Sequence, residues 1–267
     1  MSNNSPLDAG TLRQRLAQGE TTVGTFVGMA SSTAAEVCAA AGADWILLDL
    51  EHGAGSEDAL RDSILAAGAY GVPTVVRVES GERIRIGRVL DQGAAGVMVP
   101  RLDKPDQVVD AITHLAYPPR GDRGVATYNR SCRWGMDRSV LLAEEQASLG
   151  VIQIETLAAL DAVDEIAAQD GVDVLFVGPL DLSFALGVPL QFDSPVFTTA
   201  LGRVLEAAHQ HGKTAGILTA NAALAAGSVE LGFRFVAIGS DSTLLATALT
   251  EAFATARPEQ DQQRKSS

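Results

Sequence analysis

The sequence predicts a single (β/α)8 barrel. Short apolar runs alternate with alanine-rich stretches of helical period, eight such runs can be counted, and the chain of 267 residues has the length of one barrel. Alternating strands and helices are typical of βα units around a parallel sheet. Open doubly wound sheets usually end near about six strands, so eight units favour closure.

The predicted strands follow one another along the chain. In order they span residues 22–28, 44–49, 73–78, 96–100, 151–156, 173–178, 214–219 and 234–239. Helical stretches lie between them, among them STAAEVCAAAG, SEDALRDSILAAGAYG and ETLAALDAVDEIAAQ. Ser, Thr or Asp stands near their starts and Gly near several ends, as in capped helices. A GxGxxG motif is missing after the first strand, so a dinucleotide site is not predicted.

Two segments interrupt this alternation of strands and helices. Residues 117–139, YPPRGDRGVATYNRSCRWGMDRS, form a long insertion after the fourth strand and its helix. We interpret it as a βα-type loop with a functional role, because long ordered loops in compact domains usually carry function. The segment 257–267 lacks apolar periodicity. We expect it to be a flexible tail on a barrel domain of residues 1–256.

Composition narrows the class of protein. The formal net charge of -13 opposes binding to nucleic acid or an anionic membrane, which needs clustered basic residues. The first residues lack the features of a secretion signal, and no apolar run reaches the roughly 18 residues of a membrane span, so we expect a cytoplasmic protein. Two cysteines, Cys38 and Cys132, are too few for a disulfide framework and lack zinc-site spacing.

Polar residues stand where several predicted strands end. In a barrel the active site is built at the carboxyl ends of the strands, where ionised groups are costly unless they are paired or bind metal. The residues concerned are Asp49, Glu51, His52, Arg77, Gln153, Glu155, Gly178, Pro179 and Asp181. The set predicts a catalytic site at this end of the barrel.

Glu155 and Asp181 end consecutive predicted strands, so their carboxylates can converge over the barrel mouth. Two carboxylates, with water and substrate oxygens, form the oxygen-rich environment that suits Mg²⁺ or Mn²⁺. The alternative is that Asp181 caps the helix that begins nearby while Glu155 pairs with an arginine.

Asp49, His52 and Arg77 suggest acid–base chemistry. A histidine held by a carboxylate is a general base near neutral pH, provided that the side chains of Asp49 and His52 meet. The alternative is a solvated loop histidine. Arg77 ends an apolar strand and can stabilise an enolate or oxyanion, or it can simply pair with Glu51 or Glu79.

The lysines discriminate between mechanisms. There are three: Lys104 opens a helix, Lys213 precedes the seventh strand at the wrong end of the barrel, and Lys265 is in the tail. None is placed to form a Schiff base, which requires a lysine that emerges from a strand into a desolvated pocket. If the barrel handles a 2-oxoacid carbanion, a metal must therefore be the electron sink.

Over residues 20 to 250, the chain resembles the HpcH/HpaI family of metal-dependent 4-hydroxy-2-oxoacid aldolases, barrels of the phosphoenolpyruvate/pyruvate type. The motifs that carry the resemblance are GTFVGMASS, DWILLDLEHG, VVRV, GVMVPRLD, YPPRGDRGVA, VIQIET and LFVGPLDLSFALG. The resemblance implies an aldehyde-lyase that cleaves its substrate to pyruvate and an aldehyde. It implies that Glu155 and Asp181 bind Mg²⁺ or Mn²⁺, with Co²⁺ as a third candidate. His52 with Asp49 would be the base, and Arg77 would stabilise the enolate.

The resemblance also assigns further residues. Gly178 and Pro179 would help to seat pyruvate, although Pro179 has no N–H to donate. Gln153 would lie beside the metal. The family is usually a hexamer, so we expect a homo-oligomer, trimer or hexamer, in which Asp91 of a neighbouring subunit reaches the site.

Two positions depart from the family. Phe26 replaces a tryptophan common in the first strand of relatives, and the insertion reads GVATYNRSCRWG where several relatives have small apolar residues. Both are expected to contact the aldehyde half of the substrate. In the insertion, Arg123, Gly124, Arg130 and Arg133 could bind a carboxylate, or they could equally be interface residues. The aldehyde therefore cannot be transferred from a relative.

Three rival functions remain open. A CoA-ester lyase of the malyl or citryl type would need a basic strip, which only the arginines of residues 120–138 could supply. A barrel without catalysis could persist as a binding or assembly protein. A phosphate-binding isomerase would use GSDS, residues 239–242, as an anion cup.

Overall fold

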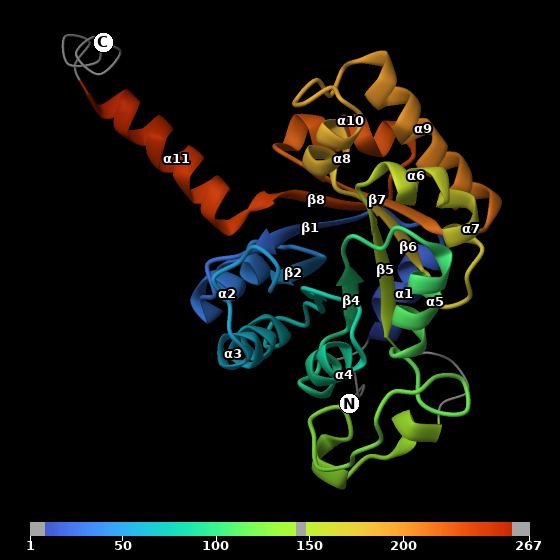
Figure 1. Cartoon of the computed structure of the whole chain (residues 1–267). Helices are drawn as coiled ribbons and strands as arrows, with labels where there is room; N and C mark the ends of the chain where they lie inside the picture. The colour runs from blue at the N-terminus through green and yellow to red at the C-terminus, as the bar shows by residue number, and fades with distance from the viewer. Residues whose placement is uncertain (1–8, 143–147, 258–267) are drawn as a thin grey trace.

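The computed structural model describes residues 9–142 and 148–257, and its eight strands close into a parallel barrel in chain order (Figure 1). The strands are β1 (Thr22–Val27), β2 (Trp45–Asp49), β3 (Thr74–Arg77), β4 (Gly96–Val99), β5 (Leu149–Ile154), β6 (Val174–Val177), β7 (Thr214–Thr219) and β8 (Phe235–Ser240). Every predicted strand is present, and the predicted (β/α)8 fold is confirmed.

The helices are α1 (Ala9–Ala17), α2 (Ser32–Ala40), α3 (Glu57–Gly68), α4 (Arg83–Asp91), α5 (Pro105–Thr113), α6 (Leu157–Asp161), α7 (Val163–Ala167), α8 (Pro179–Ala185), α9 (Pro195–Gln210), α10 (Ala222–Leu231) and α11 (Asp241–Ala256). Helix α1 precedes β1 and α11 follows β8, while the other helices connect the strands on the outside of the barrel. Side-chain caps start several of them, as Ser31 does for α2 and Thr156 for α6. The single helix predicted after the fifth strand is divided at Ala162 into α6 and α7.

The lumen of the barrel is filled with side chains. Along each strand alternate residues face inward, which places Trp45 and Leu47 of β2 in the same buried cluster as Leu149 and Val151 of β5. The Trp45 ring stacks on Phe235, with centroids 3.8 Å apart. A second apolar layer lies between the strands and the helices. The two-residue period continues to Asp49 on β2 and Gln153 on β5, so the last inward positions are polar.

Helix α1, which the sequence did not predict, closes the amino end of the barrel. Its Leu12 and Leu16 are buried in the lumen cluster. Arg13 of α1 pairs with Asp173, just before β6, at 2.8 Å, and Arg15 pairs with Asp44, just before β2, at 2.6 Å. The helix is thus fixed across the starts of the strands, and the lumen opens only at the carboxyl end.

The insertion lies at the opposite end from the predicted site. It joins α5 to β5, with two 3-10 turns, η1 (Arg133–Gly135) and η2 (Ser139–Leu142), so it is an αβ connection and the βα-type interpretation was wrong. The reason is topological: α5 runs back from the carboxyl end of β4, so the chain that follows it is at the amino end. Figure 1 shows the insertion below the start of β5.

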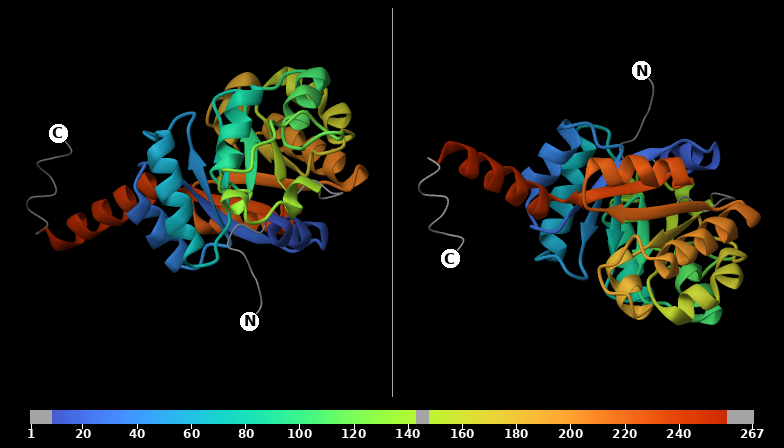
Figure 2. Two further views of the ribbon diagram at one scale, coloured as in Figure 1. Left: turned by 90° about the horizontal axis from the view of Figure 1, so that it is seen from below. Right: turned by 90° about the horizontal axis from the view of Figure 1, so that it is seen from above.

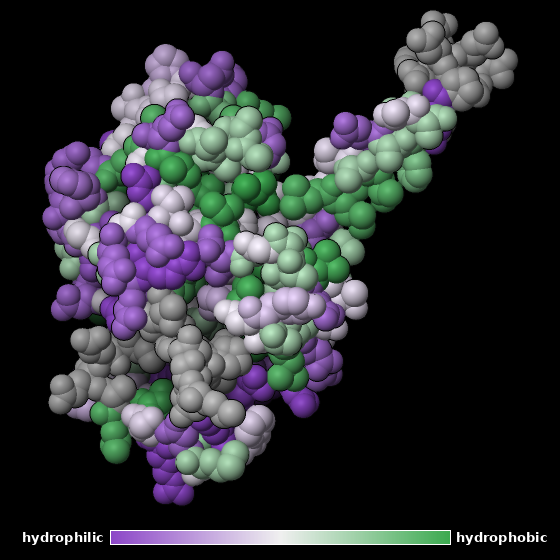
Figure 3. All heavy atoms as spheres, turned by 180° about the vertical axis from the view of Figure 1, so that it is seen from behind, coloured by the Kyte–Doolittle hydropathy of each residue, from purple (hydrophilic) through white to green (hydrophobic). Residues whose placement is uncertain are grey.

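Helix α11 projects away from the barrel instead of covering it (Figures 1 and 2). Of its side chains, that of Asp241 at its start is buried. Leu245, Leu249 and Phe253 are exposed along the helix, and they recur at the four-residue spacing of one helix face. In Figure 3 this face forms an apolar band on the projecting arm. Within residues 9–142 and 148–257, no helix has the length and apolar character to cross a membrane.

Candidate active site

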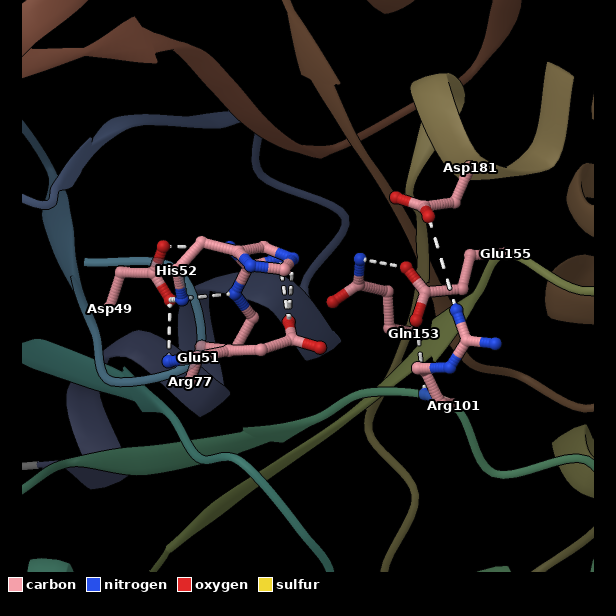
Figure 4. Close-up of polar contacts among 8 residues, drawn as sticks. All are labelled: Asp49, Glu51, His52, Arg77, Arg101, Gln153, Glu155 and Asp181. Carbon is pink, nitrogen blue, oxygen red and sulfur yellow. Dashed lines mark hydrogen bonds and ion pairs between the residues drawn. The ribbon is translucent and has the colours of Figure 1, made fainter. Parts of the chain in front are cut away.

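The residues predicted from the strand ends converge at the carboxyl end of the barrel (Figure 4). One group consists of Asp49, Glu51, His52 and Arg77, and the other of Arg101, Glu155 and Asp181. Gln153 lies between the two groups. The alternation of the strands explains this arrangement, because Asp49, Arg77 and Gln153 each occupy the last inward position of their strand.

Arg77 and Asp49 form a buried two-bond ion pair. They are direct neighbours in the β2–β3 register, and Nε and Nη2 of Arg77 donate to the Asp49 carboxylate over 2.9 and 2.7 Å. Burial alone would raise the pKa of Asp49, but the hydrogen bonds and charge of Arg77 outweigh it and lower that pKa. Burial likewise opposes the charge of Arg77, yet Asp49 raises the pKa of the guanidinium. Arg77 is therefore a fixed positive charge in the mouth.

The carboxylate beside the His52 ring belongs to Glu51. Oε2 of Glu51 lies 3.8 Å from Nε2 of His52 and 3.1 Å from Nη1 of Arg77. Asp49 instead accepts the backbone N–H of His52, at 3.3 Å. The expected contact between Asp49 and the imidazole is thus replaced by a contact with the backbone. The His52 side chain is 69% exposed, so it is open to a substrate in the mouth.

Glu155 is a buried carboxyl group at the end of β5, only 3% exposed. Its Oε1 accepts the backbone N–H of Arg101 at 3.0 Å, and its Oε2 accepts from the Gln153 amide. Burial raises the pKa of Glu155 to about 7, with further contributions from the negative charges of Asp181 and Glu51. A carboxylate in this position is stabilised by any cation that binds beside it.

Asp181 lies in the first turn of α8, with its side chain half exposed. The N-cap position of α8 is held by Gly178, so the alternative in which Asp181 caps this helix does not apply. Its Oδ1 is 4.0 Å from Nη1 of Arg101. Asp181 is therefore a carboxylate turned toward the mouth, with a loose and exposed partner.

Gly178 leaves the space that brings Gln153 and Glu155 together. A Cβ at this position would lie 2.7 Å from the Gln153 amide nitrogen and 2.8 Å from Oε2 of Glu155. Oε1 of Gln153 is buried and has no hydrogen-bond partner among the described residues. The carboxylates of Glu155 and Asp181 on this side of the mouth are oxygen donors of the kind that a hard cation prefers.

The donor set fits a cation that takes further ligands from elsewhere. In the part of the chain that the structure describes, no group of three or more His, Cys, Asp or Glu side chains is placed to hold a metal ion. Glu155 and Asp181 can supply two carboxylates. Mg²⁺ keeps several water or substrate oxygens in enzyme sites, so a two-carboxylate set leaves room for a bound substrate.

Two predicted residues, Asp91 and Arg123, lie away from this group, whereas Phe26 contacts its Arg77. Phe26 is buried in the lumen, where the Arg77 guanidinium lies 5.2 Å from its ring centroid. Arg123 and Asp91 are together at the amino end, with Nη2 of Arg123 2.8 Å from Oδ1 of Asp91. Arg123 also covers the ring of Tyr117. Within one chain, neither Asp91 nor Arg123 can contribute to the mouth.

Arg101 is the site residue that the sequence did not single out. It follows β4 in a left-handed conformation, with φ of 53°, and contacts both Glu155 and Asp181. A non-glycine residue in this region is uncommon and favours a local functional constraint. The sequence feature that could have identified Arg101 is its position just after a predicted strand, which the other site residues share.

Comparisons with known proteins agree with this geometry. A closed parallel barrel with ionisable side chains gathered at its carboxyl end has the arrangement of a barrel enzyme. Residues 22–248 match the family described as HpcH/HpaI aldolase/citrate lyase. The chain belongs to the HpcH/HpaI aldolase/citrate lyase family, and the resemblance inferred from the motifs is confirmed.

Curated relatives carry aldolase names. The chain is 38% identical over 247 residues to a hydroxypyruvate/pyruvate aldolase of Pseudomonas aeruginosa, covering 92% of each chain. It is 36% identical over 235 residues to a 4-hydroxy-2-oxo-heptane-1,7-dioate aldolase of Salmonella arizonae, covering 88% of this chain and 89% of the relative. Aldolases are carbon–carbon lyases, as the sequence predicted.

Solved structures give the same family. A HpcH/HpaI aldolase/citrate lyase family protein from Burkholderia cenocepacia superposes with a TM-score of 0.88 at 34% identity, covering 93% of this chain and 99% of the other. The citrate lyase beta subunit of M. tuberculosis is more distant, with a TM-score of 0.57 and 22% identity over 85% of this chain and 95% of the other. The latter likeness supports the fold alone.

Proposed function

We propose that the chain is a divalent-metal-dependent aldolase that reversibly cleaves a 4-hydroxy-2-oxoacid to pyruvate and an aldehyde. The observation that carries this proposal is the pairing of a buried carboxyl group, Glu155, with Asp181 on one side of the mouth and a fixed guanidinium, Arg77, on the other. A small anion such as pyruvate would be attracted both by a cation held by the first pair and by the positive charge of Arg77. The aldolase names of the relatives support the same reaction class.

Glu155 and Asp181 would hold Mg²⁺ or Mn²⁺, with Co²⁺ as a third candidate. When bound, the cation supplies a Lewis acid for the carboxylate and keto oxygens of the 2-oxoacid. Burial and the negative charges of Asp181 and Glu51 raise the pKa of Glu155, so a bound cation would stabilise its ionised form. Gln153 keeps Glu155 in place through its amide N–H. The region around Gly178 and Pro179, at the start of α8, would seat the pyruvate carboxylate.

Arg77 would hold the negative charge that develops on the enolate oxygen. The ion pair with Asp49 fixes the guanidinium before substrate arrives, so no reorganisation is needed in the transition state. Interactions of this type contribute several kcal/mol to barrier lowering, on the order of 10²-fold or more in rate.

His52 would act as the general base. In the cleavage direction its imidazole takes the proton of the C4 hydroxyl, the C3–C4 bond breaks, the electron pair stays on pyruvate as the enolate, and the imidazolium returns the proton to C3. The exposed ring at the mouth can reach a substrate hydroxyl. In the synthetic direction the same residue returns the proton to the aldehyde oxygen.

The decisive experiment is a retro-aldol screen. The metal-free protein is reconstituted with Mg²⁺, Mn²⁺ or Co²⁺, and pyruvate release is measured from acidic, sugar-derived and simple 4-hydroxy-2-oxoacids. We expect metal-dependent pyruvate release from at least one substrate. If none releases pyruvate with any of the three ions, the proposal fails. The screen also identifies the aldehyde, for which Phe26 remains a predicted determinant.

The rival functions have less support. For a CoA-ester lyase, the arginines of residues 120–138 would have to bind phosphates, but this segment is at the amino end of the barrel. For a phosphate-binding isomerase, the start of α11 would be the anion cup, yet the Asp241 carboxylate accepts the N–H groups of Gly28 and Met29 there. A non-catalytic binding protein would be revived by calorimetry that finds no Mg²⁺-dependent binding of pyruvate. A cytoplasmic location stays a prediction.

A homo-oligomer is the second part of the proposal. An isolated helix of this length is marginal in water, and α11 exposes Leu245, Leu249 and Phe253 to solvent in a single chain. A second copy of the chain that covers this face would stabilise the helix. Asp91 at the amino end is partly exposed, and its carboxylate, which pairs with Arg123, would approach a neighbouring mouth. Whether the assembly is a trimer or a hexamer is measured by light scattering.

A further inference from the structure

We propose that Arg101 is an internal competitor for the divalent cation: its guanidinium neutralises the Asp181 carboxylate in the metal-free chain and opposes the cation that takes its place. This inference rests on the proposed function for the assignment of Glu155 and Asp181 as the pair that holds the cation. It gives Arg101 a role in setting how tightly the cation is held, separate from the chemistry of the substrate.

Arg101 contacts both carboxylates, but with different parts of the residue (Figure 4). Its backbone N–H donates to Oε1 of Glu155 over 3.0 Å. Its side chain instead reaches Asp181, with Nη1 4.0 Å from Oδ1. Every residue except proline has the backbone N–H, so a substitution at this position can remove the guanidinium and leave the contact with Glu155. The charge of Arg101 can therefore be tested by itself.

The segment that carries Arg101 is fixed at the end of β5. The backbone of Arg101 is left-handed, and the next residue, Leu102, is buried. The Asp103 carboxylate accepts the Thr156 hydroxyl over 2.6 Å, and Thr156 directly follows Glu155. The backbone of Arg101 is thus held next to the carboxylate pair, whereas its long side chain is 63% exposed. The guanidinium can leave its partner carboxylate by side-chain rotation, without a change in the backbone.

The charges around the pair make Arg101 a competitor. Within residues 9–142 and 148–257, Arg101 is the one cationic side chain in ion-pair contact with Glu155 or Asp181. Arg77, across the mouth, is already paired with Asp49. Without a cation, the guanidinium balances one of the two negative charges of the ionised pair. A divalent cation balances both, so the guanidinium then becomes a like charge beside it and repels it.

The contact with Asp181 is loose enough to be replaced. A distance of 4.0 Å between side chains that are 63% and 50% exposed is an ion pair of little stability. It cannot hold Asp181 in one orientation, so loss of the guanidinium should not misplace this carboxylate. The repulsion remains: a unit charge about 6 Å from a divalent cation, in a water-like dielectric, is worth on the order of 10-fold in affinity. The site should thus hold its cation less tightly than two carboxylates alone would.

Two variants test the inference. Arg101→Gln removes the charge and Arg101→Lys retains it, and neither new side chain is branched at Cβ, so both tolerate the left-handed backbone about as well as arginine does. The readout is the Kd for Mn²⁺ of chelator-treated protein, measured by calorimetry without substrate. At about 0.01 M salt, Arg101→Gln should lower this Kd on the order of 10-fold, while Arg101→Lys stays near wild type. At about 1 M salt, the difference should shrink to about 2-fold or less, because salt screens exposed charges.

Arg120→Gln is the matched control. Arg120 is an exposed arginine of the insertion at the amino end, so its loss changes the net charge equally but far from the carboxylate pair. Its Kd for Mn²⁺ should match that of the wild type. Equal tightening in Arg120→Gln, or tightening in Arg101→Gln that persists at about 1 M salt, would overturn the inference. Weaker binding in Arg101→Gln would also overturn it, because the guanidinium would then be a support that orients Asp181.

The titration and the retro-aldol screen can fail separately. If the wild type releases pyruvate but Arg101→Gln binds Mn²⁺ no more tightly, the proposed function stands and the inference is wrong. If Arg101→Gln binds Mn²⁺ more tightly than the wild type but no substrate releases pyruvate, the inference stands and the proposed function is wrong. If neither the wild type nor Arg101→Gln binds Mn²⁺, both are wrong.

Discussion

Arg77 and Asp49 are held together by two parallel hydrogen bonds of 2.9 and 2.7 Å, on neighbouring strands and largely out of contact with water. This geometry needs the planar fork of a guanidinium, which an ammonium group cannot reproduce. The ion pair therefore has two roles: it joins β2 to β3, and it fixes the positive charge that would stabilise an enolate.

We expect Arg77→Lys to lower the rate of pyruvate release on the order of 10²-fold or more and to destabilise the fold by about 1–3 kcal/mol. The lysine keeps the charge but loses the fork and its direction. Steady-state kinetics and urea unfolding measure the two effects. Arg85→Lys, on the partly exposed outer side of α4, is the control and should change neither much. Wild-type turnover in Arg77→Lys would contradict the assigned role.

Glu155 makes the stability of the metal-free protein depend on pH. Its pKa is raised from 4.5 to about 7 in the folded chain, chiefly by burial. The folded chain thus holds a proton that the unfolded chain releases, so stability decreases as pH rises from about 4.5 to about 7 and is then constant. At about 1.4 kcal/mol per unit, the loss is on the order of 3 kcal/mol.

Glu155→Gln should remove this dependence. In the presence of a chelator, the variant should be more stable than wild type at about pH 8, on the order of 3 kcal/mol, and similar to it at about pH 5. Urea unfolding at both values gives the comparison, and Glu79→Gln is the exposed control. A variant that is less stable than wild type at the higher value would show that Glu155 is not an unbalanced charge.

Removal of either carboxylate should abolish metal-dependent catalysis. For Asp181→Ala and Glu155→Ala, we expect loss of Mn²⁺ binding in calorimetry and a fall in turnover on the order of 10²-fold or more. Asp193→Ala, an exposed acidic residue between α8 and α9, controls for general charge loss. Unchanged metal-dependent turnover in either variant would remove the pair from the mechanism.

The apolar face of α11 should govern assembly. Leu249→Asp and Phe253→Asp place charges on this face, so we expect the assembly to dissociate and the protein to lose thermal stability. Thr247→Asp, on the opposite side of the helix by periodicity, should leave the assembly intact. Light scattering distinguishes the outcomes. If wild type and all three variants have the mass of a single chain, the proposed oligomer is wrong.

The sequence predicted the strands and most of the mouth for a physical reason. A strand buried on both faces is a short apolar run, and a polar residue at its end, such as Arg77 after VV, stands out against that run. Because parallel strands end at the same edge, Asp49, Glu155 and Asp181 could be grouped without coordinates.

Other features depended on geometry that spacing does not contain. Asp49 and His52 are close in sequence, yet the β2–β3 register gives the Asp49 carboxylate to Arg77. The insertion is predicted at the wrong end of the barrel because long ordered loops usually carry function. The direction of α5 instead places it at the amino end. Arg101 escaped notice because its contribution to Glu155 is a backbone N–H, which any residue carries.

The closure of the barrel floor by α1 has a consequence for turnover. Leu12 and Leu16 close one end of the lumen and aromatic rings fill it, so within the described residues a substrate can reach the site only from the carboxyl end of the barrel. The two products of a cleavage reaction would then leave by the same route, and the product bound deeper in the site could leave only after the other. For an aldolase of the proposed kind, in which pyruvate would be held by the cation and Arg77, we expect the aldehyde to leave first and, in synthesis, pyruvate to bind first.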